Sequence, residues 1–376
     1  MVPFVDVPAT MRVHGPALEA ALAQVIRSGA FINGPKVQEL ELALAERVGV
    51  KYAVACGSGT AAEQLLLMAL EIGPGDEVAV PDFTFIATAE AVAAVGATPV
   101  CVDVDPLTFT IDPDSLRAAI GPKMRAVVPV SIFGQPAQFE VIEAICREYD
   151  LLLLEDACQS LGASRHGRAS GAFGVAGFTS FYPSKPLGGI GDGGMVFTDD
   201  ELLAERVRSR REHGHEGRHR HRVLGLNSRL DALQAVALLV KLRTFDEEVE
   251  MRNAAARRYD EALSDVLAIP HIAEGNHSSY AQYTVRAESA QARSSLSDHL
   301  LTRGIPTAVH YPQPVHTQAS MQSYIERWVD TPVTGEICST VVSLPLSAYI
   351  SKTDQDRVIA AVRSWSAVGR AALSSS

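Results

Sequence analysis

The sequence has 376 residues, of which 47 % are apolar and 20 % charged, a composition typical of a globular protein with more than one domain. Its net charge of −11 argues against nucleic acid as the main partner. The five cysteines are scattered and never form a C-x-x-C pair, so they predict neither a disulfide framework nor a zinc site. Because we find no signal segment and no apolar run long enough to span a membrane, we expect a cytoplasmic protein without a membrane anchor.

The first elements after an N-terminal arm are two helices. Apolar positions recur at helical spacing over residues 17–28, which predicts a helix there. A second helix begins at Pro35, with Gly34 or the residue before it as its cap, and runs to about Val48. We interpret this turn as a helix start and not as part of a catalytic site.

A strand over residues 52–56 leads into a turn of small residues and then into a helix. The turn contains Ser58, Gly59 and Thr60. The first N–H groups of a helix are unpaired and the helix dipole adds positive potential, so this turn is a candidate anion site that suits a phosphate. An ordinary helix cap has the same composition, so the turn alone does not separate the two interpretations.

Further apolar segments alternate with helical patterns, which predicts an α/β fold with a mostly parallel sheet covered on both faces. Two aromatic residues, Phe83 and Phe85, follow the first of these segments and either pack in the core or, for Phe85, stack on a ligand. The predicted strands cover residues 77–81, 98–105 and 125–135, and a helix follows near residues 140–149.

Four leucines over residues 151–154 run directly into Glu155 and Asp156. Such an apolar run is typical of a central parallel strand, and open α/β sheets bind ligands at the carboxyl ends of their strands. Asp156 is therefore a candidate partner for a cationic group of a ligand, because a buried aspartate keeps its charge only if a cation meets it. The alternative is a plain helix cap.

Lys185 lies between a short aromatic strand and a run of glycines, over residues 177–194. Glycine backbone can bend closely around a bound group. An unprotonated lysine amine is a nucleophile and forms a Schiff base with an aldehyde such as that of pyridoxal phosphate. Alone, Lys185 is better explained as an ordinary surface residue, but the Asp156 segment upstream favours the catalytic interpretation.

Residues 208–222 hold six arginines and four histidines. A nucleic-acid patch is disfavoured because the chain is acidic and this segment has no interleaved aromatic residues, and a metal site is disfavoured as well. We expect a mobile loop that meets the phosphates of a substrate or a neighbouring subunit.

The last third of the sequence predicts a smaller α/β domain. We place the boundary after residue 245, which gives a large domain over residues 1–245 and a small domain over residues 246–376. The small domain is predicted to hold helices over residues 247–265, 294–303 and 352–365, a strand over residues 280–286, and a disordered tail.

The segments EDACQS, at residues 155–160, and SFYPSKPLGGIGDGG, at residues 180–194, together resemble the DegT/StrS family of pyridoxal-phosphate sugar aminotransferases. The resemblance covers the chain from Phe4 to about Val362. It implies the type I fold of aspartate aminotransferase and pyridoxal 5′-phosphate, or its pyridoxamine form, as cofactor. It also implies that these enzymes transfer an amino group to a keto sugar carried on a nucleotide.

The resemblance assigns roles to particular residues. Lys185 matches the lysine that holds the cofactor, Asp156 the partner of the ring nitrogen, and Gln159 the donor to the phenolic oxygen. Ser131 stands where many members have histidine, so its role stays open. The remaining cofactor contacts are expected at Ser58, Gly59, Thr60 and Ser180 for the phosphate and at Phe85 for ring stacking.

A second match, GLNSRLDALQ at residues 225–234, implies a homodimer with shared active sites. In relatives the residue matching Asn227 reaches the phosphate of the partner's cofactor, although Asn227 could also cap the next helix. Arg229, His310 and Tyr311 resemble the branch that aminates position 3 of UDP-linked N-acetyl-3-keto-glucuronic acid, where they would clamp the uronate carboxylate. Enzymes for dTDP-3-keto- or 4-keto-6-deoxy sugars share similar segments, and Arg229 could instead bind the carboxylate of the amino donor.

The reaction implied is a transamination in two halves, with L-glutamate as the expected amino donor and Lys185 as general base and acid. The family's dehydratase branch carries histidine at the position of Lys185, so the lysine argues against that branch. A regulator that binds the cofactor without turnover is a more distant alternative.

Overall fold

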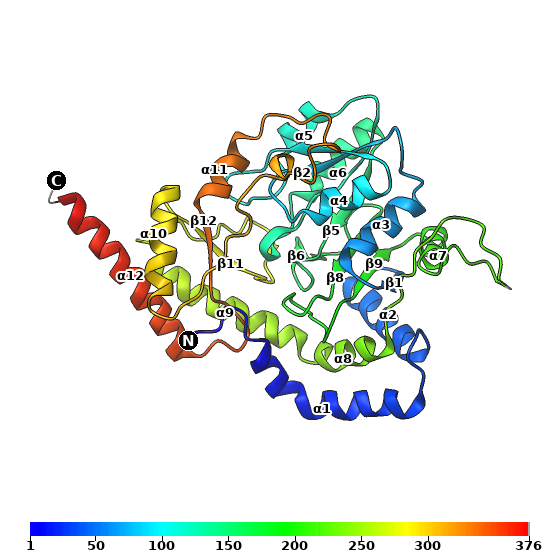
Figure 1. Cartoon of the computed structure of the whole chain (residues 1–376), viewed down its shortest axis with the longest axis horizontal. Helices are drawn as coiled ribbons and strands as arrows, with labels where there is room; N and C mark the ends of the chain where they lie inside the picture. Colours follow the sequence, from blue (N-terminus) through cyan, green and yellow to red (C-terminus); the bar gives the residue numbers. More distant parts are fainter. Residues whose placement is uncertain (218, 375–376) are drawn as a thin grey trace.

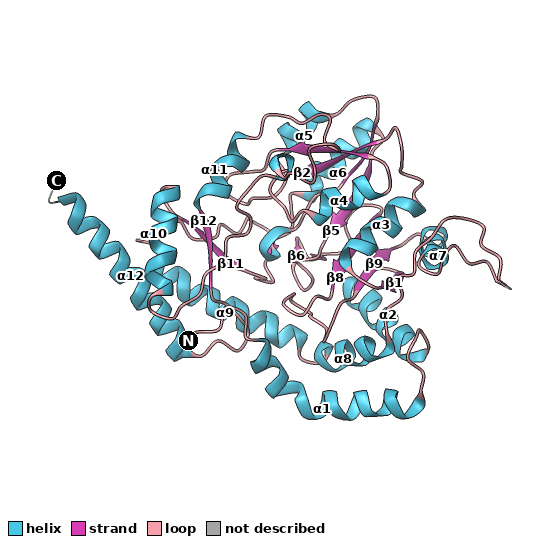
Figure 2. Cartoon of the chain, viewed as in Figure 1, coloured by secondary structure: helices cyan, strands magenta, loops and turns pink. Residues whose placement is uncertain are grey.

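The computed structural model describes residues 1–217 and 219–374 of the chain. Its main sheet has seven strands in the order β1-β9-β8-β5-β4-β2-β3, and within this sheet only β9 runs antiparallel to its neighbours. This confirms the predicted α/β architecture, in which helices surround a mostly parallel sheet (Figure 2). The strands are β1 Tyr52–Cys56, β2 Glu77–Pro81, β3 Thr98–Val102, β4 Met124–Val127, β5 Leu152–Asp156, β8 Ala176–Ser180 and β9 Gly194–Thr198.

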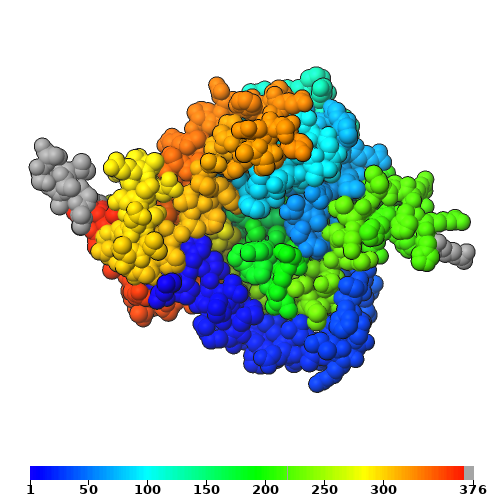
Figure 3. Space-filling view, viewed as in Figure 1, coloured from blue at the N-terminus to red at the C-terminus, as the bar shows by residue number. Residues whose placement is uncertain are grey.

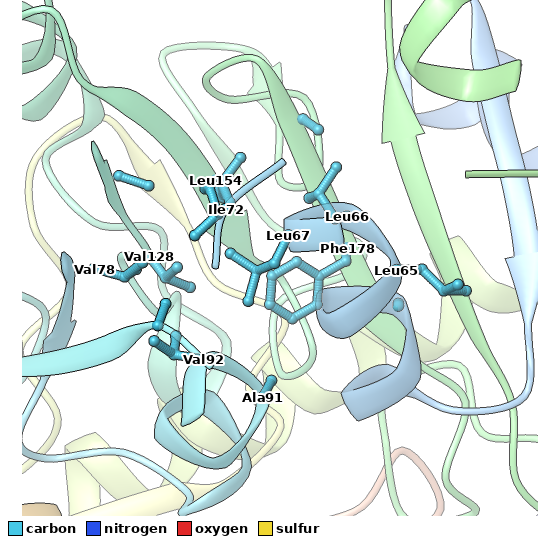
Figure 4. Packing of buried hydrophobic residues seen from close by; sticks show 14 of the residues in the cluster. Leu65, Leu66, Leu67, Ile72, Val78, Ala91, Val92, Val128, Leu154 and Phe178 are labelled. Carbon is cyan, nitrogen blue, oxygen red and sulfur yellow. The ribbon is translucent and has the colours of Figure 1, made fainter. Parts of the chain in front are cut away.

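Helices pack on both faces of the sheet because successive side chains of a strand point to opposite faces. Val54 and Cys56 of β1 belong to the cluster formed with α3, α4 and α7, whereas Ala53 and Ala55 pack with α2 and α8. Figure 4 shows the first cluster, in which Leu67 of α3 lies beside Phe178 of β8. The helices are α2 Pro35–Val48, α3 Gly59–Ala69, α4 Ala87–Ala94, α5 Pro113–Ala119, α6 Phe139–Tyr149, α7 Glu201–Arg210 and α8 Ala232–Leu242.

The N-terminal helix α1, Val7–Ser28, begins well before the predicted position. The side chain of Asp6 caps it by accepting a hydrogen bond from the Ala9 amide at 2.8 Å. Pro16 lies inside the helix, where proline usually breaks one. The helix continues because Leu18 packs against α8, and α1 and α8 lie side by side in Figure 1.

Two predicted strands are shorter in the structure. The segment predicted over residues 125–135 forms a strand only to Val127, and the one predicted over residues 98–105 ends at Val102. Pro129 has no N–H group to give to a strand partner, and the chain then turns into the 3₁₀ helix η1, Ile132–Gly134.

The C-terminal part has a core of its own. Helices α9, α10 and α12 and strands β11 and β12 enclose Tyr259, Tyr283 and Val342, and Val2 of the N-terminal segment joins them. By contrast, Val315 and Met321 pack in the core of the large sheet. The bounds are α9 Phe245–Leu263, β11 Tyr283–Arg286, α10 Ala290–Leu301, α11 Pro332–Thr340, β12 Val341–Leu344 and α12 Lys352–Ser374. Short elements complete the chain: β6 Ser164–Arg165, β7 Arg168–Ala169, β10 Asn276–His277 and η2 Val315–Thr317.

The C-terminal helix is longer than predicted. It continues past Trp365 to Ser374, so the predicted disordered tail is wrong over these residues, where alanines favour a helix. Residues 375–376, also predicted to be disordered, lie outside the described residues. In the described part of the chain, no helix is long and apolar enough to cross a membrane.

Candidate active site

Lys185 lies in the loop that joins β8 to β9, at the carboxyl edge of the sheet. Its backbone N–H donates a hydrogen bond to the Tyr182 carbonyl at 2.9 Å, and the Gly189 N–H donates to Phe181 at 2.7 Å, which folds the loop tightly. A Cβ atom on Gly188 would lie 2.3 Å from the Pro183 carbonyl oxygen, so the loop requires glycine there. Lys185 is half-buried. Figure 3 shows this segment, in green, between the dark blue N-terminal segment and the orange C-terminal segment.

Asp156 ends β5 and is buried. Its carboxylate accepts a hydrogen bond from the Cys158 amide at 2.9 Å and one from Thr88 Oγ1 at 3.2 Å. Burial raises the pKa of this carboxyl, while the two bonds and the charge of Lys185 lower it. A buried carboxylate with Lys185 near it suits the protonated ring nitrogen of a cofactor, because a buried anion keeps its charge only if a cation meets it.

The neighbouring acid Glu155 has a different role. Its carboxyl is fully buried on the other face of β5, where it accepts hydrogen bonds from Ser170, from the Gly171 amide at 2.6 Å and from Ser131 at 3.0 Å. Burial raises the pKa of Glu155 to about 7, although these bonds lower it. Ser131, whose role the sequence left open, therefore donates a hydrogen bond to Glu155 in this structure.

The N-terminus of α3 and the end of β8 form a cradle. Ser58 caps α3 by accepting a hydrogen bond from the Ala61 amide at 3.1 Å, and a helix start leaves the amides of Gly59 and Thr60 without intrahelical acceptors. A Cβ atom on Gly59 would lie 2.7 Å from Ser180 Cβ, so the two expected phosphate contacts adjoin. Free amides, a helix dipole and the Ser180 hydroxyl fit a phosphate group. Together with Asp156, the residues present therefore fit pyridoxal phosphate.

Gln159 and Phe85 both contact Tyr311. The Gln159 amide donates a hydrogen bond to Tyr311 Oη at 3.1 Å and accepts one from the Phe133 amide at 2.8 Å. The Phe85 side chain is 52 % exposed, and its ring centre lies 5.9 Å from that of Tyr311. Burial and the charge of Asp156 raise the pKa of Tyr311, so its hydroxyl stays protonated and neutral. An aromatic ring exposed to this extent offers apolar surface on which a flat ligand can stack.

Of the three residues expected to clamp a sugar carboxylate, His310 and Tyr311 are neighbours with ring centres 5.7 Å apart, whereas no hydrogen bond or ion pair links Arg229 to either of them within the described part of this chain. His310 Nδ1 lies 3.1 Å from Ser343 Oγ, and burial together with the charge of Lys185 lowers the pKa of His310. Arg229 lies in another segment, where its carbonyl oxygen borders Gly57.

Asn227 is exposed on the same segment. The alternative that it caps the next helix is wrong, because α8 begins at Ala232 with Asp231 at the cap position. The residue after Asn227 is anchored, since Ser228 Oγ accepts a hydrogen bond from the Gly57 amide at 3.1 Å. The turn that carries the phosphate cradle and the segment that carries Asn227 are thus linked.

The arginine- and histidine-rich segment is only partly a loop. Residues 208–210 belong to α7, Arg211 is buried and bonds to Glu41, and the described residues that follow form a loop that projects from the molecule beside that helix (Figure 1). His215 and His221 form an isolated β-bridge. No group of three or more potential metal ligands is found among the described residues, which leave out Arg218 of this segment.

Sequence reasoning missed Thr88 and the bond between Gln159 and Tyr311. Thr88 lies in α4, one turn from Thr84, with 3.3 Å between their hydroxyls, so a short polar chain leads to Asp156. A threonine in an alanine-rich helix is the one signal that the sequence offered.

A model of the DegT/DnrJ/EryC1/StrS aminotransferase family matches residues 14–363. The chain is 44 % identical to a UDP-2-acetamido-2-deoxy-3-oxo-D-glucuronate aminotransferase from Pseudomonas aeruginosa, over 96 % of this chain and 99 % of that one. A DegT/DnrJ/EryC1/StrS aminotransferase structure from Brucella abortus has a TM-score of 0.94 at 42 % identity and covers 97 % of this chain and 99 % of its own. NtdA from Bacillus subtilis, with its cofactor PMP bound, has a TM-score of 0.90 at 29 % identity and covers 97 % and 85 %. These structures confirm the predicted fold class.

Proposed function

The chain belongs to the DegT/DnrJ/EryC1/StrS aminotransferase family, and from this premise we propose that it transfers an amino group from L-glutamate to position 3 of UDP-2-acetamido-2-deoxy-3-oxo-D-glucuronate. That the chain is a sugar transaminase dependent on pyridoxal phosphate follows from the family. The choice of sugar is supported by the 44 % identity to the Pseudomonas aeruginosa enzyme over nearly the whole chain.

The described residues would divide the chemical work among them. The cofactor, when bound, supplies an aldehyde that takes up the amino group and a ring that accepts negative charge. Lys185 Nζ would take a proton from the α-carbon of the amino donor and deliver it to the cofactor carbon that takes up the nitrogen, and in the second half it would move a proton from that carbon to the sugar carbon that receives the amino group. Asp156 keeps the ring nitrogen protonated, the start of α3 and Ser180 bind the phosphate, and Phe85 and Gln159 orient the ring.

The substrate contacts would come from two subunits. Asn227 is exposed, and no hydrogen bond or ion pair among the described residues joins Arg229 to His310, which supports a homodimer in which Asn227 and Arg229 enter the partner's site. His310 lies close enough to Lys185 for the charge of the lysine to lower its pKa. An arginine arriving from the partner would complete a charge-assisted clamp for the uronate carboxylate.

The domain division and the location of the protein belong to the same proposal. The separate core around Tyr259 supports a small domain over residues 246–376, of which Val315 and Met321 pack against the sheet of a large domain over residues 1–245. A nucleotide-linked substrate and L-glutamate as donor suit a cytoplasmic enzyme.

The test is a substrate panel with the purified protein, pyridoxal phosphate and L-glutamate. We expect the mass of a 3-amino sugar from the UDP-linked 3-keto-uronate and slower turnover of dTDP-3-keto- and dTDP-4-keto-6-deoxy sugars, which have no carboxylate. Arg229→Met should raise KM for the uronate about tenfold, which is the value of one hydrogen bond to a charged group. Arg147→Met, on the exposed face of α6, is the control. Equal or faster turnover of a dTDP sugar would make the uronate assignment wrong.

A further inference from the structure

A buried ionic cluster lies beneath the Lys185 loop. Lys241 comes from α8, and Glu248 and Arg252 come from α9, two helices that follow each other along the lower side of the molecule in Figure 1. His14 of α1 and Tyr349, which precedes α12, complete it. We call these five residues the loop-anchor cluster.

Two cations of this cluster hold the loop directly. The Lys241 ammonium donates a hydrogen bond to the Gly188 carbonyl, and Arg252 Nη2 donates one to the Pro186 carbonyl at 3.2 Å. These carbonyls lie on either side of Leu187, and Pro186 directly follows Lys185. The path of the backbone just after Lys185 is therefore set by two charge-assisted bonds.

Glu248 balances the two cations. Its carboxylate accepts a hydrogen bond from Tyr349 Oη at 2.9 Å, lies 2.8 Å from His14 Nε2 and is 3.9 Å from Arg252 Nη2. Burying a group of charges in this way costs free energy that well-packed apolar residues would not cost. Lys241 and Arg252 each donate one hydrogen bond to the loop, so the cluster does more than join α1 to α9.

The loop, the cluster and the N-terminal segment also share a pocket. It is a small cavity of ≈ 30 Å³, and its lining includes Lys185, Ser184 and Asp6 together with Lys241 and Arg252. Arg252 Nη1 is buried and has no hydrogen-bond partner among the described residues. The cluster thus faces the same space as Lys185 from below.

We propose that Lys241 and Arg252 are positioning residues for the transamination, because they hold the loop so that the Lys185 amine points at the reacting atoms. This inference rests on the proposed role of Lys185. Neither residue is expected to touch the substrate; each acts through the backbone that carries Lys185.

The two cations differ in their response to pH. Burial lowers the pKa of Lys241 to about 8, with Glu248 raising it and Arg252 lowering it, whereas an arginine in its place would stay charged. As pH rises through about 8, Lys241 loses its proton and the bond to Gly188 loses its charge. Loop positioning should therefore weaken on the alkaline side. The ionisable groups around Lys241 are Glu248 and Arg252 of α9, His14 of α1, Tyr349 before α12, and Asp6 and Lys185 across the pocket.

The experiment compares wild type with Lys241→Met, Lys241→Arg and Arg252→Met. Each protein is incubated with pyridoxal phosphate and reduced with borohydride, and the labelled Lys185 peptide is quantified by mass spectrometry. Lys241→Met should lower the labelled fraction and lower kcat about tenfold with little change in the KM of the keto sugar. Arg252→Met should act in the same direction. Lys241→Arg should restore both values and remove the loss of labelling near pH 8. Lys123→Met, on an exposed lysine, is the control.

The outcomes distinguish an error in the proposed role of Lys185 from an error in the positioning role of Lys241 and Arg252. If wild type yields no labelled Lys185 peptide, the proposed role of Lys185 is wrong and the positioning role falls with it. If wild type is labelled and Lys241→Met matches it in labelling, kcat and pH dependence while losing only thermal stability, the cluster is structural and the inference is wrong. Where Lys241→Met does not fold, identical alkaline profiles of wild type and Lys241→Arg would overturn the inference.

Discussion

At one end of the site, Asp156, Gln159 and the start of α3 are held by hydrogen bonds within the chain. At the other end, Asn227 is exposed and Arg229 makes no hydrogen bond or ion pair with His310 among the described residues. The first end, where we propose that the cofactor binds, is preorganised by the fold of one subunit, which suits a group that stays bound. The substrate end is left open, which suits a ligand that must enter and leave, and we infer that a second subunit completes it.

The largest effect that this comparison predicts is at Lys185. Lys185→Ala removes the proposed general base and the amine that binds the cofactor, so we expect kcat with glutamate and a keto sugar to fall by about 10³-fold or more. Steady-state assays with added pyridoxal phosphate measure this. Lys123→Ala should be unaffected, and a Lys185→Ala enzyme within tenfold of wild type would show that the catalytic base lies elsewhere.

The next effect separates the two acids at the end of β5. Asp156→Asn keeps the shape but loses the charge that protonates the ring nitrogen, so we expect a loss of roughly 10²-fold in kcat. The Glu155 side chain points away from the site, so Glu155→Gln should leave kcat unchanged. The structure indicates that only Asp156 belongs to the site. An equal loss of kcat in both variants would contradict this.

Glu155 should instead govern stability. Its pKa in the folded protein, about 7, is above the unfolded value of 4.5, so the folded state binds more protons between these values. The free energy of unfolding should therefore fall as pH rises from about 4.5 to 7, by ~3 kcal/mol from this group alone. Urea unfolding at several pH values measures the slope, which Glu155→Gln should flatten.

The division of the site between subunits predicts recovery on mixing. In a hybrid dimer of Lys185→Ala and Asn227→Ala subunits, one site would combine an intact Lys185 with an intact Asn227 from the partner. Random mixing makes half of the dimers hybrid with one good site in two, so about a quarter of wild-type activity should return. Unfolding and refolding the two variants together tests this. No recovery, with hybrid dimers demonstrated, would place Asn227 in its own subunit's site.

The two ends of the site also differ in how far the sequence reveals them. Lys185, Asp156 and the Ser58 turn lie in short contiguous segments at strand ends, where local composition and the alternation of strands and helices predict their position. Arg229 and His310 could be named from the resemblance, but their distance in space depends on tertiary and quaternary packing. Such packing also supports the first turns of α1, because Met11 packs against the cluster that Leu18 forms with α8.

Contacts between distant elements could not be predicted from the sequence, for the same reason. The bonds from Lys241 to Gly188 and from Arg252 to Pro186 join helices and a loop more than fifty residues apart. A lysine within an apolar helix looks like a solvent-facing residue in the sequence. Its burial follows from the way α8 and α9 pack beneath the Lys185 loop.

The smallest predicted effect concerns the hydrogen bond from Thr88 to Asp156. Thr88→Val keeps the volume of the side chain but removes the hydrogen bond to Asp156 Oδ2, which is worth about 0.5–1.5 kcal/mol, so kcat should fall about two- to tenfold. Because this bond stabilises the charged carboxylate, its loss raises the pKa of Asp156, and the acid limb of the pH–rate profile should move to higher pH. Thr84→Val, one step further along the chain of hydroxyls, removes only the contact to Thr88 and should shift the limb less. If the acid limb shifts equally in the two variants, the two hydroxyls act as one unit on Asp156. If it shifts in neither, the Cys158 amide and the bound ring alone keep Asp156 charged.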